Sequence, residues 1–177
     1  IKVESRIEET YAKYSSANLA KALYDSYIKA FRWASDRLDE KYGGVIAFIS
    51  NGGWIDGNAM DGFRICLERE FSAIYVFNLR GNQRTSGELS RKEGGKIFGG
   101  GSRTPIAITF LIKKPNAGIE KAQIYYHDIA DHFSSAEKLP IITPYRHIPN
   151  SQIPRTLPQP HAPGARIAPS RLACHTP

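Results

Sequence analysis

Two short apolar runs on either side of a helical pattern restrict the fold of this chain more than any other feature. Residues 45–49 and 73–77 are each five apolar residues in a row. Runs of this kind are typical of strands buried on both faces of a parallel sheet. Between them, Met60, Phe63 and Leu67 recur at helical spacing within residues 56–71. The pattern predicts a strand, a crossover helix and a second strand, and therefore an α/β fold.

The turn after the first expected strand is a candidate ligand site. A crossover of this type is nearly always right-handed, and it places residues 51–57 at the carboxyl edge of the sheet, where open α/β sheets bind ligands. Asn51 and the glycines after it can bring backbone N–H groups close to a ligand. The glycine spacing differs from the G-x-G-x-x-G of dinucleotide-binding proteins. The alternative is a plain tight turn, with Asp56 or Asn58 as the helix cap.

Further elements are expected on both sides of this unit. Residues 2–14 and 18–42 carry apolar stripes that predict helices, and the second pattern ends at Gly43 and Gly44. Residues 105–112 and 123–129 are rich in β-forming side chains, with a Pro/Asn/Gly turn between them. We expect these two segments to pair as antiparallel strands at one edge of the sheet.

A glycine-rich basic segment separates the second expected strand from the third. It spans residues 80–104 and has seven glycines and six cations, Arg80, Arg84, Arg91, Lys92, Lys96 and Arg103. No Walker sequence is present. One interpretation is a mobile loop that closes on a nucleic-acid backbone, with Phe98 stacking on a base. The other is a solvated flexible loop in which Phe98 is a local anchor.

Metal and thiol chemistry receive little support from the sequence. His127, Asp128, Asp131 and His132 lie in one short segment, which cannot enclose an ion without partners elsewhere. Cys66 lies on the apolar face of a helical pattern, which favours a core thiol. The other cysteine lies in the last few residues, so no disulfide framework is expected. No metal site and no catalytic residue are predicted.

The last 38 residues differ from the rest of the chain. They hold nine of the 11 prolines, and among charged residues only arginines. Because proline forbids regular helices and central strands, we expect residues 140–177 to be an extended or disordered tail. Either the tail has no selected fold, as after a disrupted reading frame, or it is a proline-rich docking segment. The folded domain is expected to cover residues 1–139.

Charge and hydropathy restrict the class of protein. The net charge is +7, to which the arginines of the tail contribute four, so bulk charge is weak evidence for nucleic-acid binding. No apolar stretch is long enough to span a membrane, and no signal peptide is recognised. We therefore expect a cytoplasmic protein that does not bind membranes.

Several blocks of the sequence closely resemble the methyltransferase region of Type ISP single-chain restriction-modification enzymes. The resemblance runs from about residue 7 to residue 139, and its blocks are residues 23–30, 32–37, 44–56, 75–82 and 96–112. In that family, a nuclease and a helicase motor precede an adenine-specific DNA methyltransferase, and a target-recognition domain follows it. The resemblance implies part of a Rossmann-like, class I S-adenosylmethionine-dependent methyltransferase fold.

The matched region corresponds to the second half of that methyltransferase domain. The family's cofactor loop and its catalytic Asn-Pro-Pro-Tyr lie upstream of the matched blocks, and neither occurs in this sequence. The resemblance implies that S-adenosylmethionine binds in the complete enzyme and not tightly to this chain. It implies DNA as a partner, together with the missing half of the methyltransferase and the helicase and nuclease domains.

The same resemblance suggests site residues. It implies a target-base pocket formed by Phe98, Arg103, Thr104, Asn51 and Trp54, and DNA contacts by Arg80, Arg84, Arg91, Lys92 and Lys96. The first hypothesis is therefore a partial adenine-specific DNA methyltransferase that is inactive alone. The alternatives are a stand-alone nucleic-acid-binding module and a small nucleotide-binding enzyme.

Overall fold

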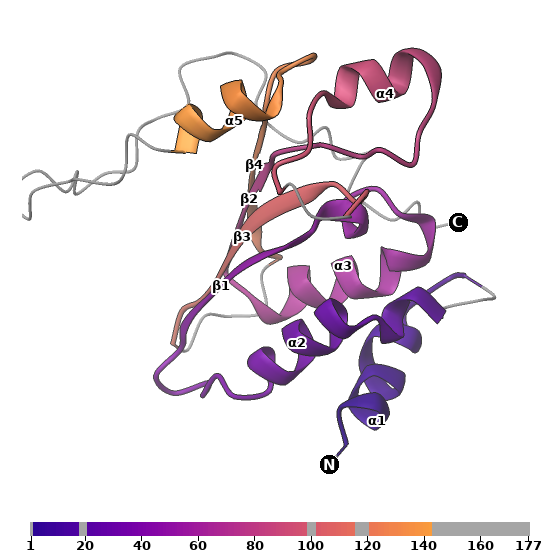
Figure 1. The fold of residues 1–177 in the computed structure, drawn as a ribbon. Coiled ribbons are helices and arrows are strands. Elements are labelled where there is room, and N and C mark those ends of the chain that lie inside the picture. Colours follow the sequence, from indigo (N-terminus) through magenta and orange to yellow (C-terminus); the bar gives the residue numbers. More distant parts are fainter. Residues whose placement is uncertain (1, 18–20, 99–101, 116–120, 143–177) are drawn as a thin grey trace, which may run out of the picture.

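A four-stranded sheet with helices on one face forms the body of the molecule (Figure 1). The computed structural model describes residues 2–17, 21–98, 102–115 and 121–142. The strands are β1 (Gly44–Asn51), β2 (Ala73–Asn78), β3 (Ile106–Lys113) and β4 (Gln123–Asp128). The helices are α1 (Val3–Ile7), α2 (Ser26–Ser35), α3 (Asp61–Glu70), α4 (Gly87–Glu93) and α5 (Ser135–Ile142). Helices α1, α2 and α3 lie on one face, and α4 and α5 lie near the end of the sheet where β1 and β2 finish.

The sheet order is β1-β3-β2-β4, and the sheet is mixed. Strand β3 is antiparallel to both β1 and β2, so β1 and β2 run in the same direction, as the sequence predicts. An inserted strand separates them, however, and β4 pairs in parallel with β2. The expected antiparallel pairing of residues 105–112 with residues 123–129 is therefore wrong.

Hydrophobic patterning explains the places of β3 and β4. Strand β3 is apolar on both faces, with Ala107 and Leu111 buried under the helices and Ile108 and Phe110 on the other side. Such a strand suits the interior of a sheet. In β4, exposed and half-buried residues alternate, which suits a strand at the edge.

Strand β1 is not buried on both faces, contrary to the prediction. Ile46 faces the core at 7% exposure, whereas Val45 and Ile49 are 62% and 63% exposed. Phe110 and Tyr125 are also exposed on the open side of the sheet. A smaller cluster around Leu79, Ile97 and Ile129 packs only against one end of this face, together with partly buried side chains that include Phe77, Ile108 and Phe133. The rest of this face is an open apolar surface with exposed side chains on β1, β3 and β4.

The main core lies between the sheet and helices α1 to α3. Its centre is a group of aromatic rings in which Phe31 contacts Phe48 and Phe63 at centroid distances of 4.8 and 5.3 Å. Trp54 joins it at 5.5 Å from Phe63, almost perpendicular to that ring. Edge-to-face and tilted pairs are the favoured geometry for aromatic side chains, so these contacts add to the hydrophobic effect of burial.

The predicted helices form with altered limits. The pattern over residues 2–14 is α1 followed by a π-helical turn at Glu8–Ala12. The pattern over residues 18–42 gives only a 3-10 turn at Lys21–Tyr24 and then α2, because Asp25 has extended backbone angles. Helix α3 starts at Asp61, after a 3-10 turn at Asn58–Met60, so neither Asp56 nor Asn58 is its cap.

Helix α5 crosses the expected domain boundary at residue 139. Ser134 and Glu137 form a capping box, in which the Ser134 N–H donates to the Glu137 carboxylate at 2.8 Å and the Glu137 N–H donates to the Ser134 hydroxyl at 3.4 Å. This cap starts a helix that continues through Pro140, where one backbone donor is lost near the end of a short helix. The helix ends at Ile142, and the rest of the expected tail, residues 143–177, lies outside the described residues.

Within the described part of the chain, no helix has the length and apolar character needed to cross a membrane.

Candidate functional site

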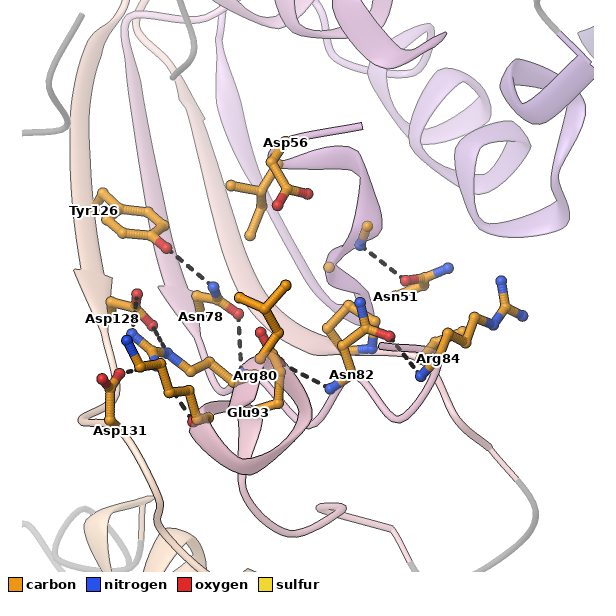
Figure 2. Close-up of a pocket in the computed structure, with 17 residues that line it drawn as sticks. Asn51, Asp56, Asn78, Arg80, Asn82, Arg84, Glu93, Tyr126, Asp128 and Asp131 are labelled. Atoms are coloured by element: carbon orange, nitrogen blue, oxygen red, sulfur yellow. Dashed lines mark hydrogen bonds and ion pairs between the residues drawn. The ribbon is translucent and has the colours of Figure 1, made fainter. Parts of the chain in front are cut away.

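A pocket of about 540 Å³ opens at the edge of the sheet where β1, β2 and β4 end (Figure 2). The turn at residues 51–57 lies at the carboxyl edge of the sheet, as predicted, and several of its residues line the pocket. Four segments converge on it, and the lining residues are Asn51, Gly52, Gly53, Ile55, Asp56, Asn78, Arg80, Asn82, Arg84, Leu89, Lys92, Glu93, Thr104, Pro105, Tyr126, Asp128 and Asp131.

Local hydrogen bonds shape the turn after β1. The side-chain oxygen of Asn51 accepts from the Gly53 N–H at 2.9 Å, and the Gly52 N–H donates to the Pro105 carbonyl at 2.9 Å. Below the turn, the buried Arg64 donates to the carbonyl oxygens of Trp54 and Gly57, both at 2.8 Å. These bonds fix the turn whose residues Asn51, Gly52 and Gly53 line the pocket.

Trp54 does not line the pocket. Its side chain is 1% exposed and lies among the core rings, so the expectation that it belongs to a base pocket is corrected. Trp54 is the last residue of the 3-10 turn Gly52–Trp54, which directs its ring into the core. Trp54 therefore supports the pocket from below.

Arg80 lines the pocket but is not an unpaired cation. Its Nε and Nη2 donate to the two oxygens of Asp128 at 2.8 and 2.9 Å, and its Nη1 pairs with Asp131. The hydrogen bonds with Asp128 raise the pKa of Arg80, and the hydrogen bond from Arg80 lowers the pKa of Asp131. The two acids of the candidate metal segment are thus engaged by an arginine.

The segment predicted as a long loop is held in place by helix α4 and its contacts. The Asn82 N–H donates to the Glu93 carboxylate at 2.9 Å, and the Gln83 side chain donates to the Gly94 carbonyl at 2.9 Å. Gly94 has φ +67°, and a Cβ there would collide with the backbone of Phe133. The glycine permits close packing within the protein, whereas one interpretation of the sequence was a mobile loop that closes on a nucleic-acid backbone.

The remaining predicted cations divide into three groups. Arg84 and Lys92 line the pocket, and no ion pair of either is found among the described residues. Arg91 pairs with Glu88 at 3.3 Å, and Arg103 donates to the Gln83 carbonyl at 2.8 Å. Two predicted residues outside the pocket lining are Lys96 and Phe98, whose ring is 53% exposed.

Of the predicted base-pocket residues, the structure brings Asn51 and Thr104 to the pocket. It adds Asn78, Asn82 and Tyr126, which the sequence did not single out. The Asn78 side chain donates to the Tyr126 hydroxyl at 3.0 Å, and its oxygen accepts from the Arg80 N–H at 3.0 Å. Asn78 could have been found from the sequence, because it is the polar residue directly after the apolar run at residues 73–77. No sequence signal pointed to Tyr126.

The candidate metal segment and Cys66 have other roles in the described part of the chain. Among residues 2–17, 21–98, 102–115 and 121–142, no group of three or more His, Cys, Asp or Glu side chains is placed to hold an ion. His127 instead packs against Phe77 at 4.9 Å. Cys66 is a core thiol, as predicted: it is 3% exposed, and burial raises its pKa to about 12.

Charged side chains of both signs line the pocket. Asp128 and Asp131 pair with Arg80. Arg84, Lys92 and Asp56 also line it, and no ion pair of these three is found among the described residues. The lining therefore presents both cations and a carboxylate to a ligand.

Three DNA-bound enzymes of known structure contain a segment similar to this chain. A nuclease-deletion mutant of the Type ISP restriction-modification enzyme LlaGI, in complex with a DNA substrate mimic, is 48% identical with a TM-score of 0.74; the alignment covers 79% of this chain. The ATP-dependent Type ISP restriction-modification enzyme LlaBIII, bound to DNA, is 42% identical over 78% of this chain with a TM-score of 0.73. This chain is similar to a segment of Type ISP restriction-modification enzymes.

The third structure, the DrdV–DNA complex, is 37% identical over 78% of this chain with a TM-score of 0.72. The present chain spans only 11%, 13% and 9% of the LlaGI, DrdV and LlaBIII chains, respectively. No protein-family model and no curated protein matches the chain. The similarity to Type ISP enzymes thus concerns one segment of about 140 residues, with the pocket at its sheet edge.

Proposed function

We propose that this chain is a segment of a Type ISP adenine-specific DNA methyltransferase and that it forms the DNA-facing side of the target-base pocket. The observation that carries the proposal is the 48% identity to a DNA-bound enzyme across a segment that includes a polar pocket at the carboxyl edge of the sheet. The sequence resemblance to the methyltransferase region supplies the reaction. Enzymes that modify a base in duplex DNA rotate the base out of the stack into such a pocket.

Two cations at the pocket, Arg84 and Lys92, fit contacts with a nucleic-acid backbone. Arg84 and Lys92 lie on the segment that carries α4, Asn51 is the last residue of β1, and Thr104 lies just before β3. Lysine and arginine contact phosphates, whereas side-chain amides recognise base edges. We therefore assign Arg84 and Lys92 to the DNA backbone, and Asn51 and Asn82 to the polar edge of an extruded base.

Methyl transfer requires groups that this sequence lacks. The Asn-Pro-Pro-Tyr of the resembling family does not occur in the chain. When bound in the complete enzyme, S-adenosylmethionine supplies the methyl group. The residues of this chain bind and orient DNA.

The open sheet is consistent with a segment of a larger domain. Val45 and Ile49 expose apolar surface on an edge strand, which isolated proteins normally protect. This feature favours the methyltransferase segment over a stand-alone nucleic-acid-binding module.

DNA binding by the full chain tests the proposal. Fluorescence anisotropy with a labelled duplex is measured across a salt series for the wild type and for the double variant Arg84→Ala, Lys92→Ala. Each lost phosphate contact reduces the slope of log affinity against log salt by about 0.9, so the double variant is expected to lose about 1.8. The charge-matched control is Arg37→Ala, Lys41→Ala, at the other end of β1, and its slope should equal that of the wild type. Equal slopes for the pocket variant and the wild type would contradict the assignment.

Methyl transfer is tested with labelled S-adenosylmethionine and adenine-containing duplex. The chain alone is expected to transfer no label and to bind the cofactor weakly by calorimetry. Turnover by this chain alone would refute the division of roles proposed here. DNA binding without any gain of methylation after the rest of the enzyme is supplied would favour the stand-alone module.

A further inference from the structure

The carboxyl end of α4 is held by side-chain and backbone donors from other parts of the chain. The Lys92 carbonyl accepts from the His132 N–H at 3.1 Å and from Arg80 Nη1 at 3.4 Å. The Glu93 carbonyl accepts from the Gly81 N–H at 3.2 Å and from Lys138 Nζ at 2.7 Å. Cations at this end of a helix also interact favourably with its dipole.

Arg80 connects this helix end to strand β4 and the residues after it. Its guanidinium forms a two-pronged pair with Asp128, reaches Asp131, and still donates to the Lys92 carbonyl. Its backbone lies in the left-handed region at φ +55°, where the Asn78 side chain accepts from its N–H at 3.0 Å. A two-pronged arginine–carboxylate pair fixes orientation as well as distance.

Lys138 makes the corresponding connection from α5. Its side chain is fully buried, and the ammonium donates to the Glu93 and Gly95 carbonyl oxygens at 2.7 and 2.9 Å. Burial lowers the pKa of Lys138. A fully buried lysine cannot contact DNA. Lys138 can therefore influence DNA binding only through the α4 segment that it holds.

The backbone contacts around Gly94 and Gly95 complete the same junction. The Gly95 N–H donates to the Phe133 carbonyl at 2.9 Å, and a Cβ on either glycine would collide with residues 133–135. The α4 segment and the segment between β4 and α5 therefore pack as one unit.

We propose that Arg80 and Lys138 are positioning residues that clamp α4 to the β4–α5 segment and so hold Arg84 and Lys92 at the rim of the pocket. In this proposal, Arg80 affects DNA binding by positioning Arg84 and Lys92, and it does not itself contact phosphate. The proposal rests on the proposed function for the role of Arg84 and Lys92, whereas the clamp itself is a property of the chain without DNA.

Hydrogen exchange in the full chain tests the clamp without DNA. The variants are Arg80→Lys, which keeps the charge and loses the fork, and Lys138→Met, which keeps the length and loses the ammonium. Each should accelerate exchange of the amides in residues 81–96 by about tenfold, the effect of losing one hydrogen bond to a charged group. Amides of β1 and β3 report whether the rest of the fold is intact, and Arg37→Lys is the matched control.

DNA anisotropy on the same variants tests the consequence. Arg80→Lys and Lys138→Met should each weaken duplex binding at constant salt, although the first variant has the wild-type charge. Unchanged exchange in residues 81–96 of Arg80→Lys, with intact strands, would overturn the clamp. Unchanged DNA affinity despite faster exchange would overturn the positioning role. If the wild type binds no DNA, the proposed function fails, while the exchange result still decides the clamp.

Discussion

The carboxylate of Asp61 accepts hydrogen bonds from the hydroxyl of Ser15 at 2.6 Å and from the N–H and hydroxyl of Ser16 at 2.7 and 2.6 Å. Its own helix adds the Gly62 N–H at 2.7 Å. Asp61 is the first residue of α3, and Ser15 and Ser16 follow the amino-terminal helices. One buried side chain therefore joins the first helical layer to the helix beside the sheet.

Replacement of Asp61 should destabilise the protein. Asp61→Ala removes the acceptor of four hydrogen bonds and leaves the donors of Ser15 and Ser16 unpaired. We expect the free energy of unfolding in urea to fall by about 2–3 kcal/mol. Asp25→Ala is the matched control, because Asp25 is exposed and makes no side-chain cap bond; it should change stability by less than about 0.5 kcal/mol. Equal losses in the two variants would contradict the role given to Asp61.

Acid should weaken the same junction. Burial alone would raise the pKa of Asp61, but the hydrogen bonds from Ser15, Ser16 and Gly62 outweigh it and lower the pKa from 3.8 to about 2. Because the folded pKa is below the unfolded one, the stabilisation is complete above the unfolded value and is lost as the pH falls from about 4 to 2. The loss amounts to about 2 kcal/mol.

Urea unfolding at several pH values measures this effect. Other carboxylates also titrate in this range, so the informative quantity is the difference between the wild type and Asp61→Asn. That difference should shrink as the pH falls below about 4. A difference that stays constant down to pH about 2 would show that the Asp61 carboxylate has an ordinary pKa in the folded protein.

The two tryptophans offer a matched test of the core. Trp54 is 1% exposed and contacts Phe31 and Phe63, whereas Trp33 is 50% exposed and lies under Arg37. Trp54→Ala should lower the free energy of unfolding by about 3–5 kcal/mol. Trp33→Ala should lower it by less than about 1 kcal/mol, the range of an exposed cation–π contact. In a Trp33→Phe variant, acrylamide should hardly quench the remaining fluorescence of Trp54; strong quenching would contradict its burial.

The open face of β1 should affect association more than stability. Val45→Thr with Ile49→Thr replaces exposed apolar groups while keeping β-branched side chains. We expect less self-association by analytical ultracentrifugation and a free energy of unfolding within about 0.5 kcal/mol of the wild type. Ile46→Thr, on the buried face of the same strand, is the control and should destabilise by about 1–3 kcal/mol. A large stability loss in the Val45, Ile49 variant would show that this face is covered within the chain.

The sequence by itself determined the elements that depend on local patterning. The runs at residues 45–49 and 73–77, with helical spacing between them, gave two strands of the same direction and the turn at Asn51 at their carboxyl edge. The Ser134–Glu137 capping box was also present in the sequence and marks a helix that the prolines of the tail concealed. In each case, neighbours along the chain supply the deciding interactions.

Only the tertiary structure decided the strand order and the use of the charges. An apolar run indicates a strand but not its neighbours, so the insertion of β3 between β1 and β2 and the open face of β1 could not be predicted. Arg80 and Arg84 are four residues apart in one basic segment, yet Arg80 pairs with acids 48 and 51 positions away and Arg84 faces the pocket. Such pairings depend on which segments the sheet brings together, and this information is absent from local sequence.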